Sequence, residues 1–147
     1  MLAKKLICFL MFSMLLAGCN LFGSSVDVEL VEMRMGKTFN DSTGVLSDLT
    51  DTFSPTDEEV VLWLSWNRVQ GENNGVIEWH TPDGKLYLED EFKFTADDGT
   101  WATWHKLPIA RTNASLTLGD WIVYISIKGK YMGQKKFKIA GTGSGDI

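Results

Sequence analysis

The sequence predicts an all-β protein, folded as a single antiparallel β-sandwich of about seven to nine strands. Three observations predict this fold. Hydrophobic and polar residues alternate with a period of two through most of the chain, as on strands that bury one face. The apolar runs are short and are separated by turn sequences that contain Gly, Pro or Asp. Residues 19–147, which follow an N-terminal targeting segment, make a chain of the size of one domain.

The first strand is expected at residues 26–35, where the alternation begins at Val26. The phase of the alternation shifts by one residue at Val31, which predicts a β-bulge or a bend. Residues 37–59 are the exception to the strand pattern, because they contain many turn-forming residues and lack a clean period. We therefore expect a long loop there.

The later strands are separated by clear turn signals. Residues 60–66 are apolar on both faces, which is typical of a central or covered strand. Residues 81–84, Thr-Pro-Asp-Gly, predict a tight hairpin turn, because proline fixes φ and glycine accepts a positive φ. The remaining strands are expected at residues 76–80, 85–89, 91–95, 100–107, 121–128 and 131–139.

Three segments resemble the immunoglobulin-like (Ig-like) β-sandwich domains of bacterial lipoproteins and other cell-envelope proteins. They are residues 60–66, residues 78–87 with their Trp-His-Thr-Pro-Asp-Gly element, and residues 118–125 together with the ending 133–139. The likeness covers about residues 53–139 and implies an Ig-like fold with an accessory role. It implies no catalytic residues, and the chain lacks the cysteine pair that joins the sheets of antibody domains.

The N-terminus has the layout of a secretory signal. Lys4 and Lys5 precede an apolar run from Leu6 to Ala17 that only Ser13 interrupts. A membrane-spanning helix needs about 20 apolar residues, so this shorter run favours a signal peptide.

The apolar run closes with Leu16-Ala17-Gly18-Cys19, which resembles the bacterial lipobox. The resemblance implies transfer of a diacylglyceryl group to the Cys19 thiol, cleavage after Gly18, and a palmitate-type lipid anchor. Two or more acyl chains give stable membrane attachment. The alternative is an ordinary signal peptide with a chance cysteine near its end.

The expected organisation follows from this cleavage. Residues 1–18 are the signal peptide, 19–25 the lipidated cysteine and its tether, 26–140 the sandwich, and 141–147 a flexible Gly-rich tail. A tether of about six residues reaches at most roughly 20 Å, so the domain is expected to work close to the membrane.

Charge excludes some partners. Removing the signal peptide takes away two lysines and no acidic residue, which changes the net charge from −5 to −7. An acidic domain is poorly suited to nucleic acid and is not attracted to anionic lipid headgroups, so the membrane contact should be the lipid anchor alone. By resemblance to Gram-negative lipoproteins, Asn20 favours the outer over the inner membrane in a cell that has two.

No catalytic or metal site is predicted. The only cysteines are Cys8 and Cys19, so the mature domain is expected to have no disulfide, thiol chemistry or zinc site. Neither His80 nor His105 stands in a ligand spacing or beside a nucleophile-elbow sequence. The acidic clusters at residues 57–59, 89–91 and 97–98 are interpreted as solvated surface. We expect no cofactor and no enzymatic activity.

Six tryptophans are many for a domain of this size. Two that follow the core phase of their strands are expected to be structural: Trp79 and Trp121. Trp63 and Trp66 are three residues apart, so a regular strand places them on opposite faces, and Trp101 and Trp104 have the same relation. Exposed rings lying side by side would suit a polysaccharide, whereas the alternatives are a protein interface and core packing.

Lysines gather in the last hairpin, at Lys128, Lys130, Lys135, Lys136 and Lys138. One interpretation is protection of a sheet edge by lysine. The other is a docking face for an acidic partner or an anionic envelope polymer.

Together these features predict a membrane-anchored envelope lipoprotein that acts as a non-catalytic binding or scaffolding module for an envelope protein or polysaccharide. The alternative function is a carbohydrate-binding module that uses exposed tryptophans. The candidate contact residues are Trp63, Trp66, Trp101, Trp104, Lys128, Lys130, Lys135 and Lys136.

Overall fold

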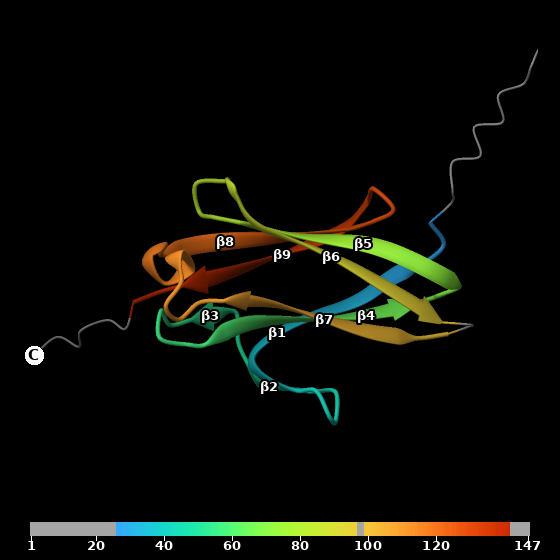
Figure 1. Ribbon diagram of the computed structural model, residues 1–147, viewed down its shortest axis with the longest axis horizontal. Helices are drawn as coiled ribbons and strands as arrows, with labels where there is room; N and C mark the ends of the chain where they lie inside the picture. The colour runs from blue at the N-terminus through green and yellow to red at the C-terminus, as the bar shows by residue number, and fades with distance from the viewer. Residues whose placement is uncertain (1–25, 97–98, 142–147) are drawn as a thin grey trace, which may run out of the picture.

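The computed structural model describes residues 26–96 and 99–141. These residues form two β-sheets packed face to face, with the hydrophobic core between them (Figure 1). The predicted all-β, Ig-like sandwich is therefore confirmed. The predicted signal peptide, the lipidated Cys19 and the end of the Gly-rich tail lie outside the described residues. None of the described helices is long and apolar enough to cross a membrane.

The first sheet has four strands in the order β2-β1-β4-β7. Its members are β1 (Glu29–Asn40), β2 (Val45–Leu49), β4 (Glu59–Asn67) and β7 (Trp101–Pro108). The second sheet has five strands in the order β3-β9-β8-β5-β6. Its members are β3 (Thr52–Phe53), β5 (Gly71–His80), β6 (Leu86–Ala96), β8 (Gly119–Ile127) and β9 (Lys130–Ile139). A short 3₁₀ helix, η1 (Asn113–Leu116), precedes β8. Every strand pairing is antiparallel except that of β3 with β9, which is parallel.

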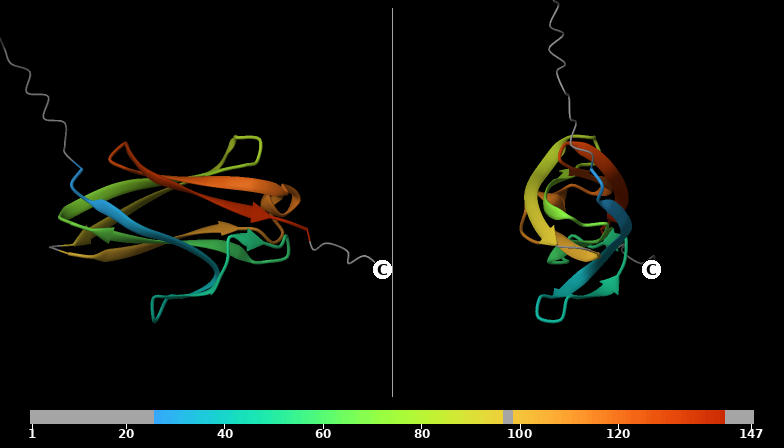
Figure 2. Two further views of the ribbon diagram at one scale, coloured as in Figure 1. Left: turned by 180° about the vertical axis from the view of Figure 1, so that it is seen from behind. Right: turned by 90° about the vertical axis from the view of Figure 1, so that its right-hand side faces the viewer.

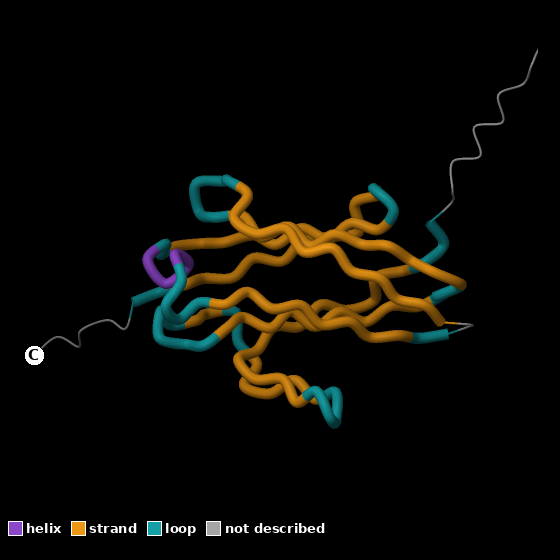
Figure 3. Tube along the Cα trace, in the orientation of Figure 1, coloured by secondary structure: helices purple, strands orange, loops and turns teal. Residues whose placement is uncertain are grey.

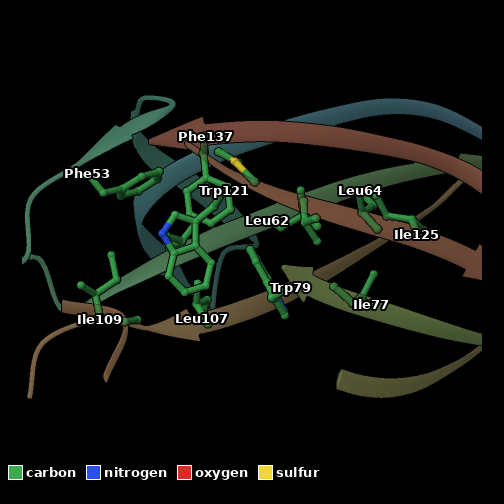
Figure 4. Close-up of a cluster of buried hydrophobic side chains, with 14 of the residues drawn as sticks. Phe53, Leu62, Leu64, Ile77, Trp79, Leu107, Ile109, Trp121, Ile125 and Phe137 are labelled. Carbon is green, nitrogen blue, oxygen red and sulfur yellow. The ribbon is translucent and has the colours of Figure 1, made fainter. Parts of the chain in front are cut away.

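The core is built from the alternating positions that the period of two indicates. Side chains of β4 and β8 face each other between the sheets, and aromatic rings from β5 and β9 fill one end (Figure 4). Trp79 and Trp121 are both fully buried and both contact Phe137 at ring-centroid distances of 5.8 and 5.9 Å. The structural role predicted for these two tryptophans is confirmed. Aromatic side chains of this size bury more apolar area than any other residue type.

Two local predictions are also confirmed. The β1–β4 register shifts between Leu30 and Glu32, and Val31 at the bulge is 59% exposed. The turn at residues 81–84 joins β5 to β6, with Gly84 at a φ of +82°. Beyond this turn, the two strands expected at residues 85–89 and 91–95 are one continuous strand, β6.

The expectation of a long loop at residues 37–59 was wrong. β1 continues to Asn40, turns through residues 41–44 and returns as β2, so residues 36–49 form a hairpin that we name the arm. The arm extends away from the rest of the sandwich, at the bottom of the view in Figures 1 and 3. It folds because Phe39 is buried against Trp104 of β7, at 4.6 Å between ring centroids. That partner is distant in sequence, so the local pattern of residues 37–59 does not indicate it.

Candidate functional site

Register and burial place the four candidate tryptophans in two cross-strand pairs. Trp66 of β4 lies opposite Trp101 of β7 on the inward face, and Trp63 lies opposite Trp104 on the outward face. The predicted opposite orientation within each strand is confirmed. Trp66 is fully buried and Trp63 is half-buried, whereas Trp101 and Trp104 are 47% and 43% exposed.

The exposure of Trp101 follows from its place in the sheet. It points to the inward face of the sandwich, but β7 is the outer strand of its sheet and Trp101 is the first residue of that strand. The opposing sheet therefore covers only part of the indole. Alternation alone assigns Trp101 to the core, and only the strand order accounts for its exposure.

Both exposed tryptophans line one hollow. β6 and β7 are outer strands of their respective sheets, and they follow each other in the chain, so their free edges lie on the same side of the sandwich. The end-on view in Figure 2 shows β6 and β7 on that side. The hollow between them has a volume of about 230 Å³ and is lined by Phe92, Lys93, Phe94, Trp101, Ala102, Thr103, Trp104 and His105. We name it the aromatic hollow.

A chain of hydrogen bonds runs beneath the aromatic hollow. Trp66 Nε1 donates to Thr103 Oγ1 at 2.9 Å. Thr103 Oγ1 lies 3.2 Å from His105 Nε2, and His105 Nδ1 lies 3.3 Å from Asp90 Oδ2. A carboxylate only accepts, so Nδ1 carries the imidazole proton and the threonine hydroxyl donates to Nε2. Each member of the chain therefore has a defined donor or acceptor role.

Burial favours the neutral form of His105. The side chain is buried and sits edge-on to Phe92, with ring centroids 4.3 Å apart. Burial lowers the pKa of His105, and the hydrogen bond and charge of Asp90 oppose that shift only in part.

The carboxylate–imidazole–hydroxyl order resembles a catalytic triad, but the hydroxyl is unsuited to attack. Thr103 is only 9% exposed, and the indole donor withdraws electron density from its oxygen. We interpret the chain as a structural network that holds the floor of the aromatic hollow. Sequence reasoning missed Thr103 and Asp90 as parts of this site, because β6 and β7 belong to different sheets.

The outward pair, Trp63 and Trp104, is flanked by β1 residues that the sequence did not single out. The Arg34 guanidinium lies 5.3 Å from the centre of the Trp63 ring and is held by Glu32 at 2.6 and 2.9 Å. Phe39 of the arm stacks on Trp104. The Trp104 ring therefore links the aromatic hollow to the outward face of the four-stranded sheet.

The lysines of the last hairpin are spread over different surfaces. Lys128 occupies the β8–β9 turn with a φ of +49°, and the exposed Lys130 follows the turn. Lys136 and Lys135 are adjacent on β9 and therefore point to opposite faces. Lys138 lies 3.7 Å from Asp120.

Some of the carboxylates interpreted as solvated have partners. Asp57 is 3.0 Å from Lys37 and accepts the backbone N–H of Ser54, so it anchors the base of the arm. Glu59 is 3.0 Å from Lys106. Within residues 26–96 and 99–141, no group of three or more His, Cys, Asp or Glu side chains is placed to hold a metal ion.

Comparisons with known proteins support the fold alone. No protein-family model matches the chain, and no curated protein matches it. Among solved structures, the chain is similar to the C-terminal domain of wzt, with 12% identity, a TM-score of 0.51, and coverage of 82% of this chain and 76% of that one.

Two further structures have TM-scores of 0.49 at 12% identity. One is an immunoglobulin-like protein from Pseudomonas aeruginosa, where the match covers 80% of this chain and 100% of that one. The other is the alkylpurine DNA glycosylase AlkC from Pseudomonas fluorescens, bound to DNA containing an abasic site analog. There the match covers 78% of this chain but only 30% of the glycosylase.

Proposed function

We propose that this protein is a lipid-anchored envelope protein that acts as a non-catalytic binding module. Its binding surface is the aromatic hollow together with the adjoining Trp63–Trp104 pair. The observation that carries this proposal is that the two most exposed tryptophans of the described chain line one open hollow at a free sheet edge.

The energetics support a binding role for these rings. An aromatic side chain has roughly 150–250 Å² to bury, and Trp101 and Trp104 each leave nearly half of their surface in water. At about 25 cal/mol per Å², covering the exposed part of each ring would contribute roughly 2–3 kcal/mol. The network below the hollow holds neighbouring side chains in place, which reduces the ordering cost of binding.

The anchor would keep this surface near the membrane. The first described residues and the β6–β7 end of the sandwich lie at the same end of the molecule (Figure 1). If Cys19 carries the lipid, the tether of about six residues reaches at most roughly 20 Å. The binding surface would then meet envelope components at the membrane surface.

Two experiments test the proposal. Metabolic labelling with a fatty acid should mark the wild-type protein and not the Cys19→Ser variant, and an unlabelled wild-type protein would contradict the anchor. Photo-cross-linking in envelopes, followed by recovery of the tagged full chain, tests the binding surface. The Trp101→Ala/Trp104→Ala variant should lose cross-linked material, whereas Lys130→Ala should not, and equal recovery from both would reject this surface.

A further inference from the structure

We infer that the aromatic hollow binds an uncharged glycan chain of pyranose sugars, which lies along the free edge of β7. This inference rests on the proposed function and names the ligand class for the same surface. Three properties of the hollow carry it: the spacing of its indoles, its polar groups, and its charge.

The indoles are spaced for a chain of rings. Trp101 and Trp104 are about 10 Å apart along β7, at roughly 3.3 Å per residue. Their side chains lie on opposite faces of the sheet, so a chain along the free edge would contact Trp101 from the inward side and Trp104 from the outward side. Two linked pyranose rings cover a length of that order. Pyranose rings present C–H groups on their flat faces, and these carry the partial positive charge that the negative face of an indole attracts.

The polar groups match hydroxyls. Asp90 does not line the hollow itself, but its side chain is 47% exposed and its oxygen Oδ2 is paired with His105, which does. An ionised carboxylate has about four acceptor positions, so further positions remain for sugar hydroxyls. β6 and β7 each pair with one neighbouring strand only, so backbone N–H and C=O groups of both free edges also face the ligand side.

Charge selects an uncharged glycan. Asp90 is flanked on β6 by Glu89 and Glu91, whose side chains point to the other face of the strand. Together the three carboxylates make this edge negative, which would repel a sulfated, phosphorylated or uronic-acid polymer. The lysine of the hollow, Lys93, lies 3.9 Å from Glu72, so its charge is partly compensated. Among the described residues, no other cationic side chain lines the hollow.

Size argues against a folded protein as the main occupant. A standard protein interface buries about 800 Å² on each partner, whereas the exposed parts of the two indoles amount to roughly 200 Å². A hollow of about 230 Å³ is suited to a narrow chain of small rings.

The test measures binding of defined oligosaccharides to the full-length lipidated protein in detergent micelles. Cellohexaose, N-acetylchitohexaose, mannohexaose and maltohexaose are the uncharged probes, and heparin and polyglutamate are the anionic ones. We expect at least one uncharged hexaose to bind with a Kd of about 10 μM to 1 mM, seen by calorimetry and by a change in tryptophan fluorescence. The anionic probes should not bind.

The variants separate the hollow from the rest of the surface. Trp101→Ala and Trp104→Ala should each weaken binding about tenfold or more, which corresponds to about 1.4 kcal/mol. Tyr131→Ala is the matched control, because Tyr131 is an aromatic residue that is 59% exposed and lies on the β8–β9 hairpin, and it should leave the Kd unchanged. Asp90→Asn should weaken binding severalfold without removing a ring, which keeps the test informative if a tryptophan variant unfolds.

Two outcomes would overturn the inference. One is the absence of saturable binding by all four uncharged hexaoses, and the other is binding that survives the loss of both indoles. If no hexaose binds but cross-linking in envelopes still depends on Trp101 and Trp104, the glycan is rejected and the binding surface stands. If cross-linking is also independent of these residues, the proposed function fails as well.

Discussion

Replacing Thr103 by valine keeps the shape of the side chain and removes its hydroxyl, so it tests the network beneath the aromatic hollow. In the wild-type protein that hydroxyl serves two buried groups, the Trp66 indole at 2.9 Å and the His105 imidazole at 3.2 Å. Both side chains are almost fully excluded from water, so water cannot replace the lost partner.

The expected loss is large for a single atom. A buried polar group left without a partner costs about 1–3 kcal/mol, and Thr103→Val leaves two such groups. We expect the free energy of unfolding to fall by about 2–4 kcal/mol, which for a domain of this size lowers the Tm by roughly 8–16 °C.

The assay is chemical and thermal unfolding followed by tryptophan fluorescence and far-UV circular dichroism. Thr103→Ser is the matched control, because it keeps the hydroxyl and loses one methyl group, at a cost of about 1 kcal/mol. Trp66→Phe removes the indole donor, and combining it with Thr103→Val gives a double-mutant cycle. The valine substitution should cost about 1 kcal/mol less in the Trp66→Phe background than in the wild type.

The reasoning would be refuted if Thr103→Val cost no more than Thr103→Ser, or if the cycle gave no coupling. The first result would mean that the hydroxyl stabilises neither partner, and the second that it does not stabilise the Trp66 indole. The hollow would then be held by packing alone.

Three further predictions concern other features. Gly75→Ala places a Cβ 2.3 Å from the Phe92 ring, so it should destabilise the fold by about 1–3 kcal/mol, as measured by denaturant melts. Because Phe92 lines the hollow, the same substitution should weaken binding there, as measured by ligand titration. Phe39→Ala removes the stack on Trp104 and should make the arm open to proteolysis at Lys37, whereas Val45→Ala on its exposed face should not; equal cleavage rates would contradict this. Because burial lowers the pKa of His105, the unfolded chain takes up its proton first as the pH falls below about 6.5. The free energy of unfolding should therefore decrease as the pH falls through that window. His105→Gln should make this dependence on pH weaker.

The parts of the fold that depend on neighbouring residues could be predicted from the sequence. The turn at residues 81–84 and the bulge at Val31 follow from residue type and from a phase shift, both of which are local. The buried phase of Trp79 and Trp121 follows from alternation along a single strand. These features hold in the structure because tertiary contacts do not override them.

The parts of the fold that depend on strand order could not be predicted from the sequence. The arm exists because Phe39 stacks on Trp104, and the two residues belong to segments far apart in the chain. The exposure of Trp101 depends on β7 being an outer strand, and the approach of Asp90 to His105 depends on the packing of two different sheets. Alternation assigns a residue to a face, but it does not say which strand lies at the edge or what lies opposite.

The position of β1 has a mechanical consequence. β1 enters the four-stranded sheet directly from the N-terminal end of the described chain and pairs with β4 from Glu29–Asn67 to Gly36–Val61. Antiparallel hydrogen bonds lie perpendicular to the strands, so tension applied at the N-terminus along β1 loads this ladder in shear, with its bonds sharing the force. A load held at the β7 edge would pass from β1 through β4 to β7, and the five-stranded sheet would stay outside the path of the force.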